Sequence, residues 1–370
     1  MARKTSLRLM TIAALAGTTF ALAACSGASD DGASATPDGS DPAATPEGSD
    51  TSAAQRTDYV IGVSNTLVGN GWREQMICSV KVQAANSGQV SKVIVANRNG
   101  GPNEQIADLQ NLISQGVDAI IVNPSDPQAL TPVIDIAVSK GIVVMAVDQA
   151  VDNEKAYVAA NDQEEYGRVG AEWLFKELGG EGNVAYLRGI AGAPADTDRD
   201  KGFQAALKDY PGIKIVSTVD TGWDYSKAGQ QITQILNTAQ IDGVWTSGTD
   251  YTVVNAFDAT NTTPVPVVGQ ATNEFINQLT TRPEVKGAVV TNPAVIGAVG
   301  TELALRVLNG ETVDRLTMLK PRVLDMANDA DELNAWVFPN QPATFASQLQ
   351  EKPYTNYTDE ELLTCKGPGE

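Results

Sequence analysis

Histidine is absent from this sequence of 370 residues. The chain therefore lacks the commonest general base of enzymes and the commonest metal ligand of proteins, which excludes Ser-His and Cys-His nucleophiles. The glycine-rich loops that hold nucleotide phosphates and the G-x-S-x-G turn of hydrolases are missing too. We expect no metal, no cofactor and no catalytic residue, although the many carboxylates leave a secreted carbohydrate-active enzyme open.

Basic residues are scarce, with 26 Lys and Arg against 45 Asp and Glu and a formal net charge of −19. Binding to nucleic acid needs a basic surface that matches the phosphates, so nucleic acid is not an expected partner. Aromatic residues are also few, at 6%, but hydrophobic residues make up 42% of the chain. This composition is that of a globular protein with room for two domains.

Only three cysteines occur, and the first stands where a lipid anchor would be attached. A basic start and a short apolar run precede residues 22–24 (Leu-Ala-Ala), so residues 1–24 have the organisation of a secretory signal peptide. The small residues followed by Cys25 resemble a lipobox, and this resemblance implies that Cys25 is lipidated; an ordinary signal peptide is the alternative. Residues 25–57 are rich in Ser, Ala and Asp and predict a disordered linker.

The two remaining cysteines, Cys78 and Cys365, form an even pair in a chain that is predicted to be exported. Because exported proteins fold in an oxidising compartment, we expect a disulfide between them. Two buried free thiols are the alternative. A disulfide would pin the C-terminal end of the chain against an early part of the folded region.

From residue 58 onward, short apolar runs alternate with longer segments of helical spacing. One series of runs includes residues 59–63 and 119–122, and a second series after residue 161 includes 184–187 and 243–246. Near-continuous apolar strands separated by amphipathic helices are typical of parallel sheets covered on both faces, and two series predict two α/β lobes. Ligands of such sheets bind beyond the carboxyl ends of the strands.

Polar and aromatic side chains gather at these predicted strand ends, where amides, carboxylates and flat rings together suit a polyhydroxylated, uncharged ligand. Structural roles are the alternative, for example core packing for Trp72 and helix capping for Asn123. The candidates in the first series are Asn70, Trp72, Arg73, Asn123, Asp148 and Gln149. Those in the second series are Asp196, Thr197, Arg199, Trp223, Asp250, Gln270, Asn273, Thr291 and Asn292.

Three stretches carry a resemblance to a known family: residues 121–126 (IVNPSD), 147–149 (VDQ) and 189–203, which opens GIAG and closes RDKGF. From residue 58 to about 323 the chain resembles the ribose-binding-protein group of periplasmic sugar-binding proteins, the type I solute-binding components of ABC transporters. The resemblance implies an α/β fold of two doubly wound parallel-sheet lobes joined by a three-strand hinge. It also implies that the lobes close on the ligand.

Carried onto this chain, the family's first lobe falls at residues 58–159 and 293–322. Its second lobe falls at 160–292 and 323–340, and residues 341–370 form a C-terminal extension. These bounds place the predicted strand ends of the two lobes around one cleft.

The family's ligand positions are only partly kept. Its first-loop asparagine and aromatic residue fall on Asn70 and Trp72, whereas its Asp-Arg pair becomes Asp148 followed by Gln149. Its second-lobe arginine falls on Thr197. The resemblance therefore implies a sugar-like ligand, and the changes argue against ribose itself.

These observations predict an extracytoplasmic protein that is held by lipid at the outer face of a membrane, in a periplasm or beneath a cell wall. It would capture a monosaccharide or sugar alcohol and present it unchanged to an ABC permease in that membrane, and one-to-one docking favours a monomer. Three alternatives stay open: a binding protein that feeds a membrane sensor of a sugar or quorum signal, a transcription regulator with the same two-lobed core, and a secreted carbohydrate-active enzyme. The export signal and the lack of a DNA-binding helix pair before residue 58 argue against the regulator.

Overall fold

A computed structural model describes residues 56–370. The predicted signal peptide, Cys25 and the predicted linker up to residue 55 lie outside the described residues. From residue 56 onward, no helix combines the length and the apolar character needed to cross a bilayer.

Lobe 1 is built on a six-stranded parallel sheet with the strand order β11-β5-β4-β3-β1-β2. Every residue of its central strand β3 is buried, because helices cover both faces of the sheet. Side chains alternate between the faces, so Ile121 packs toward α1 and α9 whereas Ile120 packs toward α2 and α3. The strands are β1 (Tyr59–Asn65), β2 (Val90–Asn97), β3 (Ala119–Val122), β4 (Val143–Asp148), β5 (Tyr157–Asn161) and β11 (Leu316–Leu319). The helices are α1 (Gly71–Ser87), α2 (Pro102–Ser114), α3 (Thr131–Ser139) and α9 (Ile296–Leu308).

Lobe 2 repeats this plan with the strand order β12-β10-β9-β8-β6-β7, in which only β12 runs antiparallel to its neighbour. Helices α4 and α5 cover one face around Phe203 and Trp245, and α6, α7 and α8 cover the other around Phe257 and Phe275. The strands are β6 (Glu181–Arg188), β7 (Gly212–Asp220), β8 (Gly243–Thr246), β9 (Val267–Gln270), β10 (Gly287–Val290) and β12 (Val323–Asp325). The helices are α4 (Gln163–Glu177), α5 (Pro194–Asp209), α6 (Tyr225–Thr238), α7 (Asp250–Thr260) and α8 (Asn273–Thr281).

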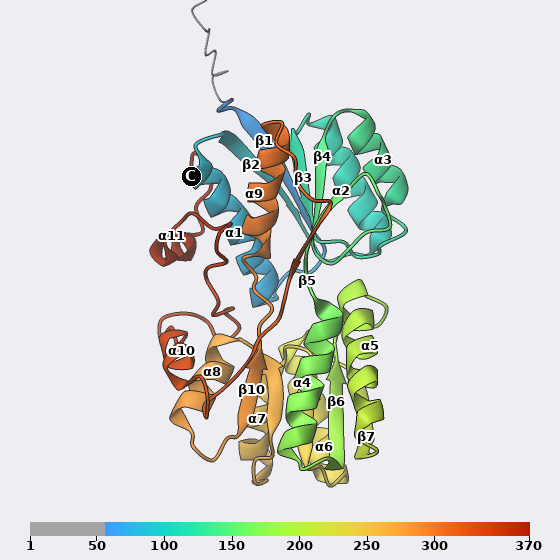
Figure 1. Ribbon diagram of the computed structural model, residues 1–370, viewed down its shortest axis with the longest axis vertical. Coiled ribbons are helices and arrows are strands. Elements are labelled where there is room, and N and C mark those ends of the chain that lie inside the picture. The colour runs from blue at the N-terminus through green and yellow to red at the C-terminus, as the bar shows by residue number, and fades with distance from the viewer. Residues whose placement is uncertain (1–55) are drawn as a thin grey trace, which may run out of the picture. The chain divides into compact units, whose positions relative to one another are not determined.

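The chain passes between the lobes three times: from β5 into α4, from β10 into α9, and from β11 into β12 (Figure 1). The first passage is very short, since only Asp162 separates β5 from α4. A residue at the start of α4 is therefore held close to both lobes.

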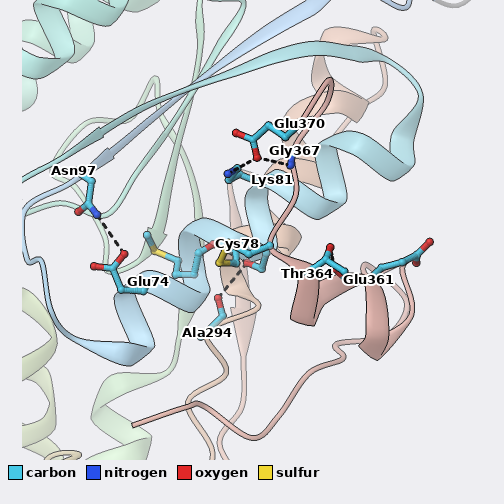
Figure 2. The surroundings of a disulfide bond; sticks show 12 residues. Glu74, Cys78, Lys81, Asn97, Ala294, Glu361, Thr364, Gly367 and Glu370 are labelled. Atoms are coloured by element: carbon cyan, nitrogen blue, oxygen red, sulfur yellow. Dashed lines mark hydrogen bonds and ion pairs between the residues drawn. A yellow bond between two sulfur atoms is a disulfide. The ribbon is translucent and has the colours of Figure 1, made fainter. Parts of the chain in front are cut away.

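The C-terminal part of the chain contains two short helices, α10 (Ala330–Ala335) and α11 (Asp359–Thr364), and a long segment between them. This tail bonds to both lobes. Ala346 forms a β-bridge with Thr272 of lobe 2, and its backbone N–H and carbonyl also bond to the side-chain amide of Gln75 in lobe 1. The structure forms the predicted disulfide between Cys78 on α1 and Cys365, at the end of α11 (Figure 2).

Candidate functional site

A narrow cavity of about 30 Å³ is lined by residues that follow strands of both sheets. Eight residues predicted from the sequence line it: Asn70, Trp72, Arg73, Asp148, Arg199, Trp223, Gln270 and Asn292. Five further lining residues were not predicted as ligand contacts: Leu67, Ala195, Tyr225, Ser247 and Gly248. The carboxyl ends of the strands therefore meet at one cavity, as the parallel sheets led us to expect.

The first turn of α1 supplies three lining residues from lobe 1. Asn70 caps this helix by accepting a hydrogen bond from the backbone N–H of Arg73 at 3.1 Å, which leaves its Nδ2 to donate to the carbonyl of Trp223 in lobe 2 at 3.3 Å. Trp72 donates from Nε1 to the carbonyl of Asn292 at 2.6 Å. The ring of Trp72 is therefore fixed against the passage between β10 and α9.

Arg73 is a buried cation. Its Nη1 donates to Asn65 Oδ1 at 3.2 Å. Burial lowers the pKa of Arg73 to about 10, while the nearby charges of Asp148 and Arg199 act in opposite directions on it. The guanidinium therefore stays charged at neutral pH.

Two lining residues other than glycine have a left-handed backbone, with φ of 68° at Asp148 and 54° at Trp223. Residues other than glycine adopt this region rarely, and such strain is found mainly at functional sites. The ring of Trp223 lies against Gly189, where any Cβ would overlap the indole. Its Nε1 also donates to Ser247 Oγ at 3.2 Å, so the position of this half-buried ring is set from two sides.

Arg199 enters the cavity from α5. Its Nε donates to Gln163 Oε1 at 2.8 Å and its Nη1 donates to Ser247 Oγ at 2.9 Å. The guanidinium carbon lies 4.0 Å from the centre of the Tyr166 ring, an arrangement that stabilises a buried cation.

Gln163 bonds to two charged groups of the cavity, Asp148 and Arg199, although the sequence did not predict it as a site residue. Its Nε2 donates to Asp148 Oδ1 at 2.7 Å and to Asn292 Oδ1 at 3.1 Å, while its Oε1 accepts from Arg199. The residue holds this position because α4 starts directly after the passage from β5. A glutamine at the start of a helix is too common for the sequence to have singled it out.

Comparison with known proteins identifies the family of this fold. A family model described as the periplasmic binding protein domain matches residues 61–312, well over half of the chain. The chain belongs to this family. Ribose import binding protein RbsB of Bacillus subtilis is 25% identical over 268 residues, which cover 71% of this chain and 86% of that protein. The xylitol-binding protein of Mycolicibacterium smegmatis is 33% identical over 178 residues, 46% of this chain and 50% of that protein.

Solved structures share the fold. An ABC transporter solute binding protein from Thermobispora bispora matches with a TM-score of 0.72 at 24% identity, covering 83% of this chain and 94% of that chain. A solute binding protein from Bacillus halodurans with bound myo-inositol matches with a TM-score of 0.69 at 24% identity, covering 76% and 99%. The predicted family and the predicted two-lobed α/β fold are confirmed.

Seven predicted ligand contacts of this periplasmic binding protein do not line the cavity. Two of them connect the lobes behind it: Gln149 accepts from the backbone N–H of Ala195 at 2.9 Å and donates to Asn123 Oδ1 at 2.6 Å. Where the family pattern has an arginine, this chain thus uses an amide to hold the start of α5. Asn123 is fully buried beneath that amide.

The other five do not line the cavity, and most of them are bonded to neighbouring residues. Asp196 is paired with Arg188 at 2.6 Å, and Thr197 is exposed on α5. Asp250 accepts hydrogen bonds from the backbone of Gln270 and the hydroxyl of Thr272, and burial raises its pKa to about 6. Asn273 and Thr291 complete the set: Asn273 donates to the carbonyl of Phe338, and Thr291 accepts from the backbone of Arg322.

Within residues 56–370 no cluster of three or more Cys, Asp or Glu side chains has the arrangement of a metal site. The described cavity offers rings, amides, two guanidinium groups and one carboxylate. Such groups can hold a hydroxylated molecule by stacking and hydrogen bonds.

Proposed function

We propose that this chain is the substrate-binding component of an ABC importer, and that it captures a monosaccharide or sugar alcohol outside the cytoplasm and presents it to a membrane permease. The cavity carries this proposal, because residues of both lobes line it with aromatic faces and buried polar groups. The names of the relatives support it as well, since they are a ribose import binding protein and a xylitol-binding protein.

Each lobe would contribute one flat ring and several hydrogen bonds. Trp72 of lobe 1 and Trp223 of lobe 2 would pack on the C–H faces of the ligand, while Asp148 would accept from a hydroxyl. A buried donor or acceptor that loses its ligand partner costs binding energy, so a fully lined cavity discriminates between sugars that differ in one hydroxyl.

Three contacts would hold the lobes together around the ligand. Asn70 donates to the carbonyl of Trp223, Gln149 accepts from the start of α5, and Gln163 donates to Asp148. These bonds would break when the lobes move apart, as in other proteins that close by a hinge.

A lipid on Cys25 would keep the protein near its permease. The folded part would be a monomer, and one copy would dock to one permease. Mass spectrometry of the mature N-terminus tests the anchor: it should find a diacylated Cys25, and a Cys25→Ala variant should be released from membranes. An unmodified N-terminus at another residue would refute lipid attachment.

Thermal unfolding with a panel of pentoses, hexoses and sugar alcohols tests the central proposal, because a ligand that binds the native state raises the melting temperature. At least one compound should do so. Its effect should be lost in Trp223→Ala and kept in Trp336→Ala, a substitution outside the cavity lining. If no carbohydrate of any kind changes the melting temperature, the proposed function fails.

A further inference from the structure

The cavity contains more positive than negative charge. Its charged lining residues are Arg73, Arg199 and Asp148, with side chains from residues that are only 7%, 3% and 4% exposed. Within the lining, two cations and one carboxylate give a net charge of plus one. The three groups share one electrostatic site, since both Asp148 and Arg199 change the pKa of Arg73.

Both guanidinium groups keep donors for a ligand. Arg73 donates only to Asn65, and its remaining N–H groups have no acceptor in the described chain. Arg199 is held through Nε and Nη1, while its Nη2 meets no acceptor among residues 56–370. Asp148 accepts from Asn161 and Gln163 through Oδ1 alone, so Oδ2 remains for a ligand hydroxyl.

Other acidic residues near the cavity do not balance this charge. The carboxylate of Asp196 is already paired with Arg188, at 2.6 Å. Asp250 lies outside the lining, and its charge is not among those that act on Arg73. Tyr225 lines the cavity, but burial raises the pKa of its phenol well above its ordinary value, so it stays neutral.

Arg73 gives its own helix no electrostatic benefit. It lies in the first turn of α1, where the helix dipole favours anions and disfavours cations. Burying an arginine there costs free energy twice, through desolvation and through the dipole. A ligand that carries negative charge would offset both costs.

We propose that the ligand is a sugar acid, a polyhydroxylated carbon chain with one carboxylate that binds Arg73 and Arg199 while Asp148 accepts from a hydroxyl. This inference rests on the proposed function and replaces the uncharged ligand that residue types alone predicted. The planar fork of an arginine matches a carboxylate, and one carboxylate supplies the single missing charge. A phosphate monoester brings about 1.5 to 2 negative charges at neutral pH and would exceed it.

Isothermal titration calorimetry with matched pairs of compounds tests this inference. We would compare gluconate with glucose and glucitol, xylonate with xylose and xylitol, and galacturonate with galactose, at one pH and one ionic strength. In at least one set the acid should bind about ten- to a hundredfold more tightly than its neutral counterparts, the range expected for hydrogen bonds to charged groups.

Two variants that each remove one positive charge test whether Arg73 causes the preference for the acid. Arg73→Gln should remove the preference for the acid, because it should lower the affinity for the acid more than the affinity for its neutral counterpart. Lys92→Gln removes the same charge from an exposed position on β2 of the same lobe and should leave the preference intact. If Lys92→Gln lowers acid binding as much as Arg73→Gln does, the arginine has no specific role and the inference is wrong.

The possible outcomes separate this inference from the proposed function. If neutral sugars bind as tightly as their acids, the sugar-acid inference is overturned and the sugar-binding function stands. If glucose 6-phosphate binds more tightly than gluconate, the commitment to a single carboxylate is overturned. If neither acids nor neutral carbohydrates bind, both proposals fail together.

Discussion

Helices α4 and α5 of lobe 2 lie side by side (Figure 1). Their backbones are in contact at Gly202, where a Cβ would overlap the carbonyl oxygen of Glu164. In lobe 1, α1 and α9 also approach through a glycine, Gly297, but here the C-terminal tail lies along α1 and a disulfide closes the contact (Figure 2). Both lobes thus depend on a missing side chain at a helix contact, and lobe 1 is fastened in addition by a covalent bond between distant parts of the chain. The two lobes should therefore respond to different perturbations.

Removing the disulfide should have the largest effect. The bond joins residues 287 positions apart, so the pair Cys78→Ser and Cys365→Ser should lower the free energy of unfolding by about 4 kcal/mol. Hydrogen exchange measured by mass spectrometry should increase in α1, α9 and α11 and much less in α4 and α5. Equal increases in both lobes would contradict the comparison.

Adding a side chain at the close contact between α4 and α5 should have the second-largest effect on stability. Gly202→Ala forces α4 and α5 apart and should cost about 3 kcal/mol in urea unfolding, with faster exchange in those two helices. Gly229→Ala in α6 is the matched control, because its new Cβ would lie 3.7 Å from the nearest atom. That control should be neutral or slightly stabilising. A stable Gly202→Ala protein would show that the helix contact is adaptable.

Cutting the tail from lobe 1 without touching the disulfide should have an intermediate effect. Gln75→Ala leaves the buried N–H and carbonyl of Ala346 without their partner and should cost about 2 kcal/mol. Asn86→Ala, on the same helix, removes an exposed hydrogen bond to Glu361 and should change the unfolding free energy far less. Equal losses from both variants would mean that burial of the Gln75 amide has no importance.

The ion pair between Lys81 and Glu370 should matter least (Figure 2). The lysine holds the pKa of Glu370 below its ordinary value, but this carboxylate is exposed and solvent screens the pair. Glu370→Gln should leave the urea midpoint unchanged within error. A clear loss of stability would show that the last residues of the tail, as well as the disulfide, fasten lobe 1.

The fold was readable from the sequence because strands buried on both faces appear as short apolar runs, as β3 does. The directions in which individual polar side chains point could not be read from the sequence. Asp148 ends a buried strand and Asp250 comes shortly after one, yet only Asp148 has a left-handed backbone and lines the cavity. Asp250 starts a helix and bonds to the loop after β9. Such differences depend on contacts between segments that are distant in the chain.

The net positive charge of the cavity lining was also visible only in three dimensions. Arg188 and Arg199 have the same residue type and both lie near predicted strand ends, but Arg188 meets two carboxylates whereas Arg199 meets amide and hydroxyl groups. Only the structure tells which arginine keeps donors for a ligand.

The place of Gln163 has a kinetic consequence. Its single amide contacts Asp148 from lobe 1, Arg199 from lobe 2 and Asn292 in the passage between them. Any motion that separates the lobes must pull this amide away from Asp148, the group that we propose accepts from a ligand hydroxyl. Escape of the bound molecule and opening of the protein then share one barrier, so a substitution at Gln163 should change the dissociation rate even though its side chain is not part of the cavity lining.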